Sequence, residues 1–322
     1  MSMPAMQADE PLNRAAARPL LEVRDLVTRF DINAGIFGRA VRRVHAVEGI
    51  SFEIAPGETL ALVGESGCGK STTGRSIVQL ELPTSGSVKF EGHELIGLSS
   101  TELRPFRRHM QMIFQDPFAS LNPRMTAASA IAEPMRVHGI ASGTALRDKV
   151  LDLLRRVELG PEHMDRYPHE FSGGQRQRLC IARALGLNPK LLIADEAVAA
   201  LDVTIQAQVI NLLMDLQDEF GLSFLFISHD MAVVERISHR VAVMYLGEIV
   251  EIGPRAAVFD NPSHSYTRKL LGAVPIADPR RRPEGRLLMV DEIPSAVRDL
   301  DYKAVKRPMR EISPGHFAQE EA

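Results

Sequence analysis

Short apolar runs and segments of helical spacing alternate along the chain. Apolar and polar residues alternate from Leu20 to Phe30 and from Val44 to Ile54, which is typical of β-strands with one exposed face. The runs Thr59–Val63, Leu191–Ala194 and Ser223–Ile227 are almost continuously apolar, as expected of parallel strands covered on both faces. The pattern predicts a mixed α/β fold, in which ligands bind at the carboxyl ends of the buried strands.

Helical periodicity dominates between residues 125 and 160, where Ala, Leu and Arg are frequent. The spacing predicts a helix over Leu146–Val157 and another over Gln175–Leu185, so we interpret this part as a helical insertion in a mixed domain. Asp31–Arg43 is predicted to be a loop because two glycines interrupt the strand pattern. The tail from Asp278 on balances acids against bases and is predicted to be a solvated extension rather than a nucleic-acid patch.

The composition excludes several classes of protein. Of the 322 residues, 45% are hydrophobic and 25% are charged, and the net charge of −3 gives no support for a nucleic-acid binder. The two cysteines are too few for a disulfide framework and fit a reducing cytoplasm. No apolar run is long enough for a membrane span, and residues 1–19 lack the apolar segment of a signal peptide. We expect residues 1–19 to form a disordered leader and any membrane role to depend on partners.

A glycine-rich stretch follows the first buried strand and precedes a segment of helical spacing. It reads G-x-x-x-x-G-K-S and consists of Gly64, Glu65, Ser66, Gly67, Cys68, Gly69, Lys70 and Ser71. Strand, glycine-rich loop and helix in this order indicate a phosphate-binding loop, where backbone N–H groups and the helix N-terminus face an anion. Lys70 is expected to reach the β- and γ-phosphates and Ser71 to bind Mg²⁺. The chain is therefore predicted to bind a nucleoside triphosphate.

Four further candidates stand at the ends of predicted strands. Asp195 is placed to hold Mg²⁺ and Glu196 to polarise an attacking water, although solvated acids that cap the next helix would give the same pattern. His229 follows another buried strand, where a lone histidine is also common as a structural residue. Phe30 can stack on a base or fill the core, and its spacing leaves both interpretations open.

A short motif lies between the phosphate loop and the acidic strand. Ser172, Gly173, Gly174 and Gln175 follow Phe171 and look like the LSGGQ signature of the nucleotide-binding subunits of ABC transporters. Taken with the phosphate loop and the carboxylates, the motif makes nearly the whole chain resemble that family. The resemblance implies an α/β fold of the ABC nucleotide-binding type, with a RecA-like parallel-sheet core, an antiparallel β subdomain and a helical subdomain.

The resemblance also implies roles for the residues around the nucleotide. Phe30 corresponds to the aromatic residue that stacks on adenine, and residues 64–71, supported by Thr72, cradle the phosphates of ATP. Gln115 corresponds to the glutamine that touches Mg²⁺ and the attacking water and that senses the membrane subunit. ATP and Mg²⁺ are thus the implied cofactors.

The acidic strand and the signature are implied to complete the reaction centre. Asp195 corresponds to the metal-holding aspartate, Glu196 to the catalytic carboxylate and His229 to the switch histidine at the γ-phosphate. The signature, residues 172–175, opens a helix whose N–H groups face an anion. In this family that anion is the γ-phosphate bound on the partner subunit. Two such domains therefore enclose two ATP molecules, and hydrolysis is tied to closure of the dimer.

Two segments resemble the ATPases of dipeptide, oligopeptide and glutathione importers more closely. Asp116–Met125 looks like their segment after the glutamine, and Asn261–Leu271 looks like their C-terminal H-P-Y-T-R-x-L-L motif, with Ser265 in place of proline. The resemblance is strongest to the C-terminal half of the glutathione importer's ATPase, where two nucleotide-binding domains are fused. Because one such domain is seen here, a second ATP-binding subunit or a second copy of the chain is expected.

The chain departs from the family pattern beside the catalytic carboxylate. Ala197 and Ala199 stand where proline and serine are usual. Both follow Glu196 and leave the two carboxylates in place, so we still expect hydrolysis. Some peptide-importer ATPases carry C-terminal cysteines for an iron–sulfur cluster; this tail has none, and no cluster is predicted.

The predicted organisation has three parts. The leader of residues 1–19 precedes an ABC nucleotide-binding domain of residues 20–260, whose helical subdomain covers about residues 118–185, and residues 261–322 form a peptide-importer-type extension. The implied function is ATP hydrolysis that drives import of glutathione or short peptides at the cytoplasmic face of the cell (inner) membrane. The implied partners are two transmembrane permease subunits, a second ATP-binding subunit and a solute-binding protein, with no nucleic acid.

Other functions of the same catalytic core fit the sequence less well. An importer of another solute, such as a dipeptide, an oligopeptide or nickel, is the nearest alternative. A DNA-repair or chromosome-maintenance ATPase would carry a long coiled coil between the phosphate loop and the signature, and no heptad run is present. Translation-associated relatives hold two cores in one chain, and an exporter would lack the C-terminal peptide-importer motif.

Overall fold

The central sheet carries the phosphate loop and the acidic strand. The structure, a computed structural model, describes residues 18–34, 39–273, 296–300, 302, 304 and 307–321. The strands of the central sheet, in spatial order, are β12 (Met309–Ser313), β13 (His316–Gln319), β10 (Glu248–Pro254), β9 (Arg240–Tyr245), β3 (Thr59–Val63), β8 (Ser223–Ser228), β7 (Leu191–Asp195) and β6 (Met110–Ile113). The strands from β9 to β6 run parallel to one another.

Burial on both faces explains the apolar runs of this sheet. Every residue of β3, β7 and β8 is buried, and a parallel strand covered by helices or a second sheet has no exposed face for polar side chains. Because β8 lies between β3 and β7, the carboxyl ends of these three strands meet at one edge of the sheet. The phosphate loop follows β3, Asp195 and Glu196 stand at the end of β7, and His229 follows β8.

An antiparallel sheet packs against the core. Its strands, in spatial order, are β11 (Val297–Arg298), β2 (Arg39–Ile54), β1 (Leu21–Ala34), β4 (Ser85–Phe90) and β5 (His93–Glu94). The loop predicted over Asp31–Arg43 is wrong at both ends, since β1 and β2 continue their ladder there and Asp31 pairs with Arg43. The Arg43 guanidinium donates to the Asp31 carboxylate at 2.5 Å, so a cross-strand ion pair supports a polar hairpin that the apolar pattern could not indicate.

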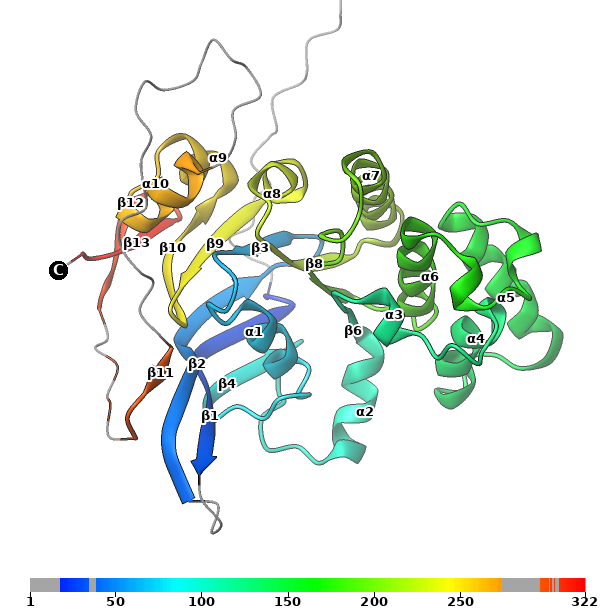
Figure 1. The fold of residues 1–322 in the computed structure, drawn as a ribbon, viewed down its shortest axis with the longest axis horizontal. Helices are drawn as coiled ribbons and strands as arrows, with labels where there is room; N and C mark the ends of the chain where they lie inside the picture. The colour runs from blue at the N-terminus through cyan, green and yellow to red at the C-terminus, as the bar shows by residue number, and fades with distance from the viewer. Residues whose placement is uncertain are drawn as a thin grey trace, which may run out of the picture.

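Helices cover the central sheet and form a separate region at one end of the molecule (Figure 1). They are α1 (Lys70–Ile77), α2 (Ser100–His109), α3 (Pro117–Ser120), α4 (Ala127–Val137), α5 (Gly143–Arg156), the 3₁₀ helices η1 (Pro161–His163) and η2 (Pro168–Glu170), α6 (Gly173–Leu185), α7 (Val203–Phe220), α8 (Met231–Ile237), α9 (Arg255–Asp260) and α10 (Ser265–Gly272). The helical insertion predicted over residues 125–160 corresponds to α4 and α5, which share one hydrophobic cluster with α6, α7 and the central sheet.

The C-terminal tail corrects a prediction. It is not simply a solvated extension, because β12 and β13 extend the central sheet beyond β10. The polar pattern misled because His316, which is fully buried in β13, is hydrogen-bonded through Nε2 to the equally buried Glu251 of β10. Residues 274–295 and the leader up to residue 17 lie outside the described residues. The boundaries of residues 1–19, 20–260 and 261–322 remain predictions.

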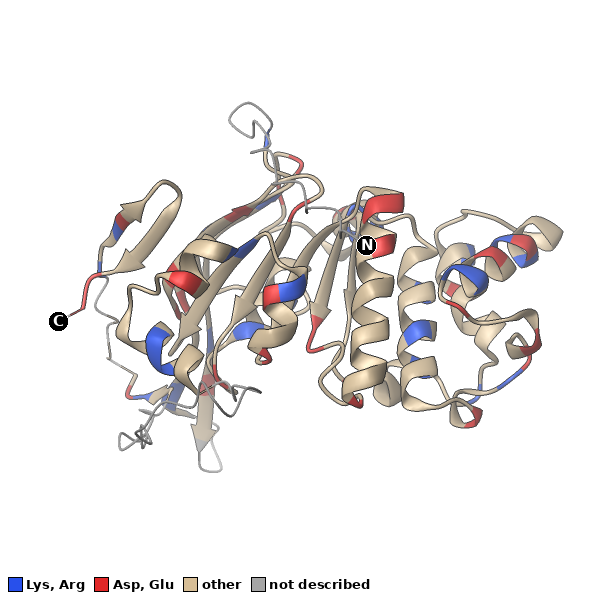
Figure 2. Cartoon of the chain, turned by 90° about the horizontal axis from the view of Figure 1, so that it is seen from above, with Lys and Arg blue, Asp and Glu red and all other residues tan. Residues whose placement is uncertain are grey.

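Charge is dispersed over the described residues. Figure 2 shows basic and acidic side chains interspersed on the helices and strands, with both signs on the helical region at one end. None of the described helices combines the length and the apolar character that a membrane-spanning helix requires.

Candidate functional site

The phosphate loop adopts a conformation that requires glycine at two points. Gly64 has φ +149°, and a Cβ there would lie 2.2 Å from the carbonyl oxygen of Met244. Gly69 has φ +110°, and its Cβ would lie 2.0 Å from the carbonyl oxygen of Ala46. Any larger residue would therefore force the backbone of the loop away from its neighbours.

The loop closes around the Lys70 ammonium group. Its Nζ donates to the carbonyl oxygens of Gly64 at 2.7 Å and Glu65 at 2.8 Å. The side chain is 4% exposed, so the charge lies inside the loop rather than in solvent. Cys68 is also buried, and burial raises the pKa of its thiol. A neutral thiol adds no charge to the loop, so Lys70 dominates its electrostatics.

A cavity of about 260 Å³ opens beside the loop. It is lined by Phe30, Val44, Ala46, Ser66, Gly67, Gly69, Lys70, Ser71, Thr72, Gln115 and Glu196. Phe30 is 38% exposed and belongs to the wall of the cavity, not to the core. The sequence pattern placed Val44 and Ala46 on a strand but missed them as lining residues, since nothing local indicates that β2 faces the loop.

Ser71 and Asp195 meet beneath the cavity. The Ser71 hydroxyl donates to Asp195 Oδ1 at 2.6 Å, across 124 positions of sequence. Asp195 is 1% exposed, and its Oδ2 is buried without a hydrogen-bond partner among the described residues. Burial raises the pKa of Asp195, while the Ser71 hydrogen bond opposes that shift. An orphaned carboxylate oxygen beside a hydroxyl fits a bound cation, because the cation would satisfy both.

The described residues contain no group of three or more His, Cys, Asp or Glu side chains arranged to hold a metal ion. This donor set suits Mg²⁺ rather than zinc, because Mg²⁺ is commonly held by one or two carboxylates together with substrate phosphates and waters. The residues therefore fit the cofactor that the sequence implies.

Glu196 stands at the centre of a hydrogen-bonded group. Its Oε2 accepts from Gln115 Nε2 at 2.7 Å, and its Oε1 lies 3.4 Å from His229 Nδ1. Its backbone is left-handed at φ +47°, which is uncommon for a residue with a Cβ, and its N–H donates to the carbonyl of Ile227 at 3.0 Å. The structure thus brings two predicted residues, Gln115 and His229, from separate chain segments to the carboxylate of a third, Glu196.

The signature lies apart from this cavity. Ser172 caps α6 by accepting from Gln175 N–H, and Gln175 Oε1 accepts from Ser172 N–H in return. A Cβ on Gly174 would lie 2.4 Å from Ile205, so this position admits only glycine without repacking. Ser172 and Gly173 are exposed, and residues 172–175 are not among those that line the cavity. Within one chain, the signature does not reach the phosphate loop.

Tyr266 is a residue that the sequence interpretation did not assign to the site. Its hydroxyl accepts from the backbone N–H of Glu65 at 3.0 Å, across 201 positions of sequence. The C-terminal motif that contains it was noticed only through its resemblance. No local signal in that motif indicates a contact with the phosphate loop.

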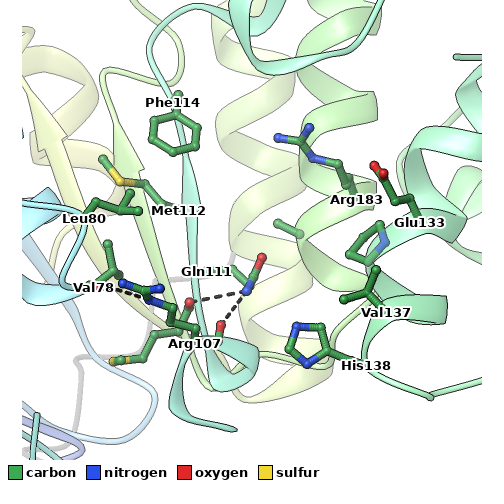
Figure 3. Close-up of a pocket in the computed structure, with 13 residues that line it drawn as sticks. Val78, Leu80, Arg107, Gln111, Met112, Phe114, Glu133, Val137, His138 and Arg183 are labelled. Carbon is green, nitrogen blue, oxygen red and sulfur yellow. Dashed lines mark hydrogen bonds between the residues drawn. The ribbon is translucent and has the colours of Figure 1, made fainter. Parts of the chain in front are cut away.

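A second cavity, of about 400 Å³, lies between the sheet and the helical region (Figure 3). Val78, Leu80, Met112 and Phe114 form one side, and Val137 of α4 lies opposite. Its polar groups at the base satisfy one another: Arg107 donates to the carbonyls of residues 78 and 79, and Gln111 donates to the carbonyl of residue 107. Leu80 and Val137 are 53% and 56% exposed, so the groove presents exposed apolar side chains on both sides, while Glu133, His138 and Arg183 add polar groups to its lining.

Comparison with known families and proteins gives consistent similarities. Residues 47–199 match the ABC transporter family model, and residues 250–297 match the model for the C-terminal region of oligopeptide/dipeptide transporters. The chain is 56% identical over 323 residues to the glutathione import ATP-binding protein GsiA of Salmonella paratyphi A. That alignment covers 98% of this chain and 52% of the relative, so the chain spans about half the length of this curated relative.

Two solved structures are similar in fold. One is the ATP-binding cassette MJ0796 in a dimeric post-hydrolysis state bound to ADP and Pi, with a TM-score of 0.65, 28% identity, and coverage of 73% of this chain and 98% of that chain. The other is cbiO1 of Clostridium perfringens, part of the transporter complex cbiONQ, with a TM-score of 0.64, 27% identity, and coverage of 76% of this chain and 91% of that chain.

Proposed function

Because this chain belongs to the family of ABC transporter ATP-binding domains and carries the C-terminal region of oligopeptide/dipeptide transporters, we propose that it hydrolyses ATP to drive a membrane importer. The observation that carries this proposal is the Glu196 carboxylate, held between Gln115 and His229 at the wall of the phosphate-loop cavity. A buried lysine, a cradle of N–H groups and a positioned carboxylate are what phosphoryl transfer to water requires.

Some residues of the cavity bind ATP and others take part in the reaction. Phe30 stacks on the base, residues 64–72 surround the phosphates, and Lys70 exchanges its carbonyl partners for phosphate oxygens. Asp195 and Ser71 would hold Mg²⁺, which would supply positive charge to the phosphates when bound. Glu196 accepts a hydrogen bond from the attacking water and orients it for in-line attack. Gln115 and His229 keep that carboxylate directed at the cavity.

The signature then acts on a second ATP-binding subunit. Residues 172–175 open α6 but lie outside the cavity of their own chain, so their N–H groups are available to a γ-phosphate on a partner. The similar cassette MJ0796 was solved as a dimer. The partner is a second copy of this chain or a separate ATP-binding subunit.

Substitution Ser172→Arg tests this arrangement. It is expected to block hydrolysis without weakening ATP binding to the isolated chain, because the bulky cation occupies the partner's phosphate site and leaves its own cavity intact. Turnover and the ATP Kd should be measured on the same preparation. Ser99→Arg is the matched control, since Ser99 caps α2 with the same reciprocal pair of hydrogen bonds. Weaker ATP binding in Ser172→Arg alone would mean that the signature acts within one chain.

The apolar groove of Figure 3 is the proposed docking site of a permease subunit. Phe114 lines the groove, and the next residue, Gln115, holds the Glu196 carboxylate. A short helix of a membrane protein that inserts between Leu80 and Val137 would cover their exposed side chains and bear on the segment that carries Gln115. Such a contact couples occupancy of the groove to the geometry of the reaction centre.

Val137→Asp tests the groove. The buried charge at the contact is expected to prevent assembly with the permease and to abolish ATP-driven transport, while ATP hydrolysis by the isolated chain changes by less than about twofold. Co-purification with the permeases and transport into vesicles are the measurements. Ile312→Asp is the control, since Ile312 is an exposed apolar residue of β12, far from the groove (Figure 1). Normal assembly of Val137→Asp would contradict the docking site.

The proposed solute is glutathione or a short peptide, and the proposed location is the cytoplasmic face of the cell (inner) membrane. Support comes from the relative named as a glutathione import ATP-binding protein and from the C-terminal transporter region.

A tagged pull-down from detergent-solubilised native membranes, with the co-purifying chains identified by mass, tests the assembly. Two multi-span permeases would support it, with the associated solute-binding protein then screened against glutathione, dipeptides, oligopeptides and nickel. Recovery of the chain without a membrane partner would contradict the transport function.

A further inference from the structure

The C-terminal region reaches the phosphate loop through one side chain. Tyr266, near the start of α10, is 7% exposed and directs its hydroxyl to the backbone N–H of Glu65 at 3.0 Å. Its ring packs on Tyr245, with 4.3 Å between ring centroids, and shares a buried cluster with Val63, the residue before the loop. The ring is therefore enclosed, and the hydroxyl has a fixed direction.

Glu65 is held from both sides of its backbone. Tyr266 accepts from its N–H, and Lys70 Nζ donates to its carbonyl oxygen at 2.8 Å. Glu65 follows Gly64, where the chain turns at φ +149° into the loop. A buried backbone N–H without a partner is costly, and at this turn the chain has no ladder to supply one. The tyrosine hydroxyl supplies the acceptor that a neighbouring strand would supply in a sheet.

Tyr266 is itself anchored by a buried carboxylate. Glu251 of β10 accepts from the backbone N–H groups of Ser263 at 2.8 Å and His264 at 2.9 Å, and from His316 Nε2 at 2.7 Å. His264 Nδ1 in turn accepts from the N–H of Tyr266 at 3.1 Å. Burial lowers the pKa of His264 and so favours the neutral ring that such an acceptor needs. The first turn of α10 is thus tied to β10 and to the C-terminal strand β13.

We propose that Tyr266 is a positioning residue for the ATP site: it holds Glu65, and through it the phosphate loop, in the conformation that receives the triphosphate. The C-terminal region, by way of Glu251 and His316, sets the position of that tyrosine. Tyr266 touches no reacting atom; it acts by keeping the N–H groups of the loop pre-ordered, so that ATP binding need not order them. This inference rests on the proposed ATP site.

Tyr266→Phe removes the hydroxyl and keeps the ring. The KM for ATP is expected to rise about three- to tenfold, the range that follows from one lost hydrogen bond to a part-buried backbone group. The kcat should change by less than about twofold, because Glu196, Gln115 and His229 are untouched. Tyr245→Phe is the matched control: it makes the same change on the neighbouring ring, whose hydroxyl makes no hydrogen bond among the described residues, and should leave KM unaltered.

Amide hydrogen exchange gives a readout that does not depend on turnover. In Tyr266→Phe without nucleotide, the backbone amide of Glu65 should exchange faster, while amides of β7 and α6 keep their protection. A purely structural role would instead lower Tm and leave both KM and Glu65 exchange unchanged, and that result would overturn the proposal. Failure of the wild-type chain to bind ATP would refute the ATP site itself, whereas normal wild-type binding with an unchanged KM in Tyr266→Phe would refute only the role of Tyr266.

Discussion

Replacing Glu196 by glutamine is expected to leave ATP binding intact and to lower turnover by a factor of about 10² or more, the usual contribution of a positioned general base. Glutamine keeps the shape of the side chain, and its amide still packs between Gln115 and His229, which contact the carboxylate in the wild type. It loses the negative charge that draws a proton from the attacking water. Binding uses the phosphate loop and Lys70, so the Kd for ATP should stay within about twofold of the wild-type value.

The same substitution should trap a closed dimer. If hydrolysis reopens the pair of ATP sites, then a chain that binds ATP and cannot hydrolyse it accumulates in the closed state. Gel filtration of Glu196→Gln with ATP and Mg²⁺ should therefore give a dimer, and omission of ATP should restore the monomer. Glu235→Gln, the same change on an exposed carboxylate of α8, is the control and should turn over normally. A monomer in the ATP-loaded variant would contradict the coupling of hydrolysis to dimer opening.

Lys70→Ala is expected to raise the Kd for ATP about 10- to 100-fold, since hydrogen bonds to a charged group contribute about 1.5–3 kcal/mol. Lys70 Nζ is buried inside the loop, and the carbonyl groups of Gly64 and Glu65 already hold it in place. Folding has already removed water from this ammonium group, so ATP binding does not incur the free-energy cost of desolvating it. Calorimetric titration with a slowly hydrolysed ATP analogue measures the change.

A matched substitution separates this effect from a general loss of charge. Lys149 lies exposed on α5, and Lys149→Ala should bind the analogue as the wild type does. Because Lys70→Ala also leaves two carbonyl oxygens without their donor, Tm should be recorded for both variants. An unaltered Kd in a folded Lys70→Ala variant would refute the assignment of the loop to ATP.

The predictions that came from contiguous motifs agree with the structure and the comparisons. The α/β class, the buried parallel strands and the resemblance to ABC transporter ATP-binding subunits are confirmed by the sheet order, the similar cassettes and the family models. Residues 64–71 can be recognised from the sequence because one local loop conformation requires glycine, lysine and serine at fixed spacing. The domain boundaries and the roles of the individual site residues stay predictions, for which the substitutions above are the tests.

Where prediction failed, long-range pairing was the cause. The polar pattern of the tail predicts a solvated extension, yet β13 enters the central sheet, where His316 Nε2 donates to the buried Glu251 carboxylate. The glycines beyond Phe30 predict a loop, yet Asp31 and Arg43 form a cross-strand ion pair in a hairpin there. In both cases a polar residue is paired with a residue on another strand, and a hydropathy pattern contains no information about that partner.

The sequence alone predicts the parts of the candidate site: a phosphate loop, two carboxylates at the end of a buried strand and a signature that opens a helix. How these parts meet can be seen only in the folded chain. The strand order β3–β8–β7–β6 brings Ser71 to Asp195 and Gln115 and His229 to Glu196, and the packing of α10 brings Tyr266 to Glu65. The physical reason is that a local motif depends on backbone geometry within a few residues, whereas a contact between distant side chains depends on how the whole sheet is assembled.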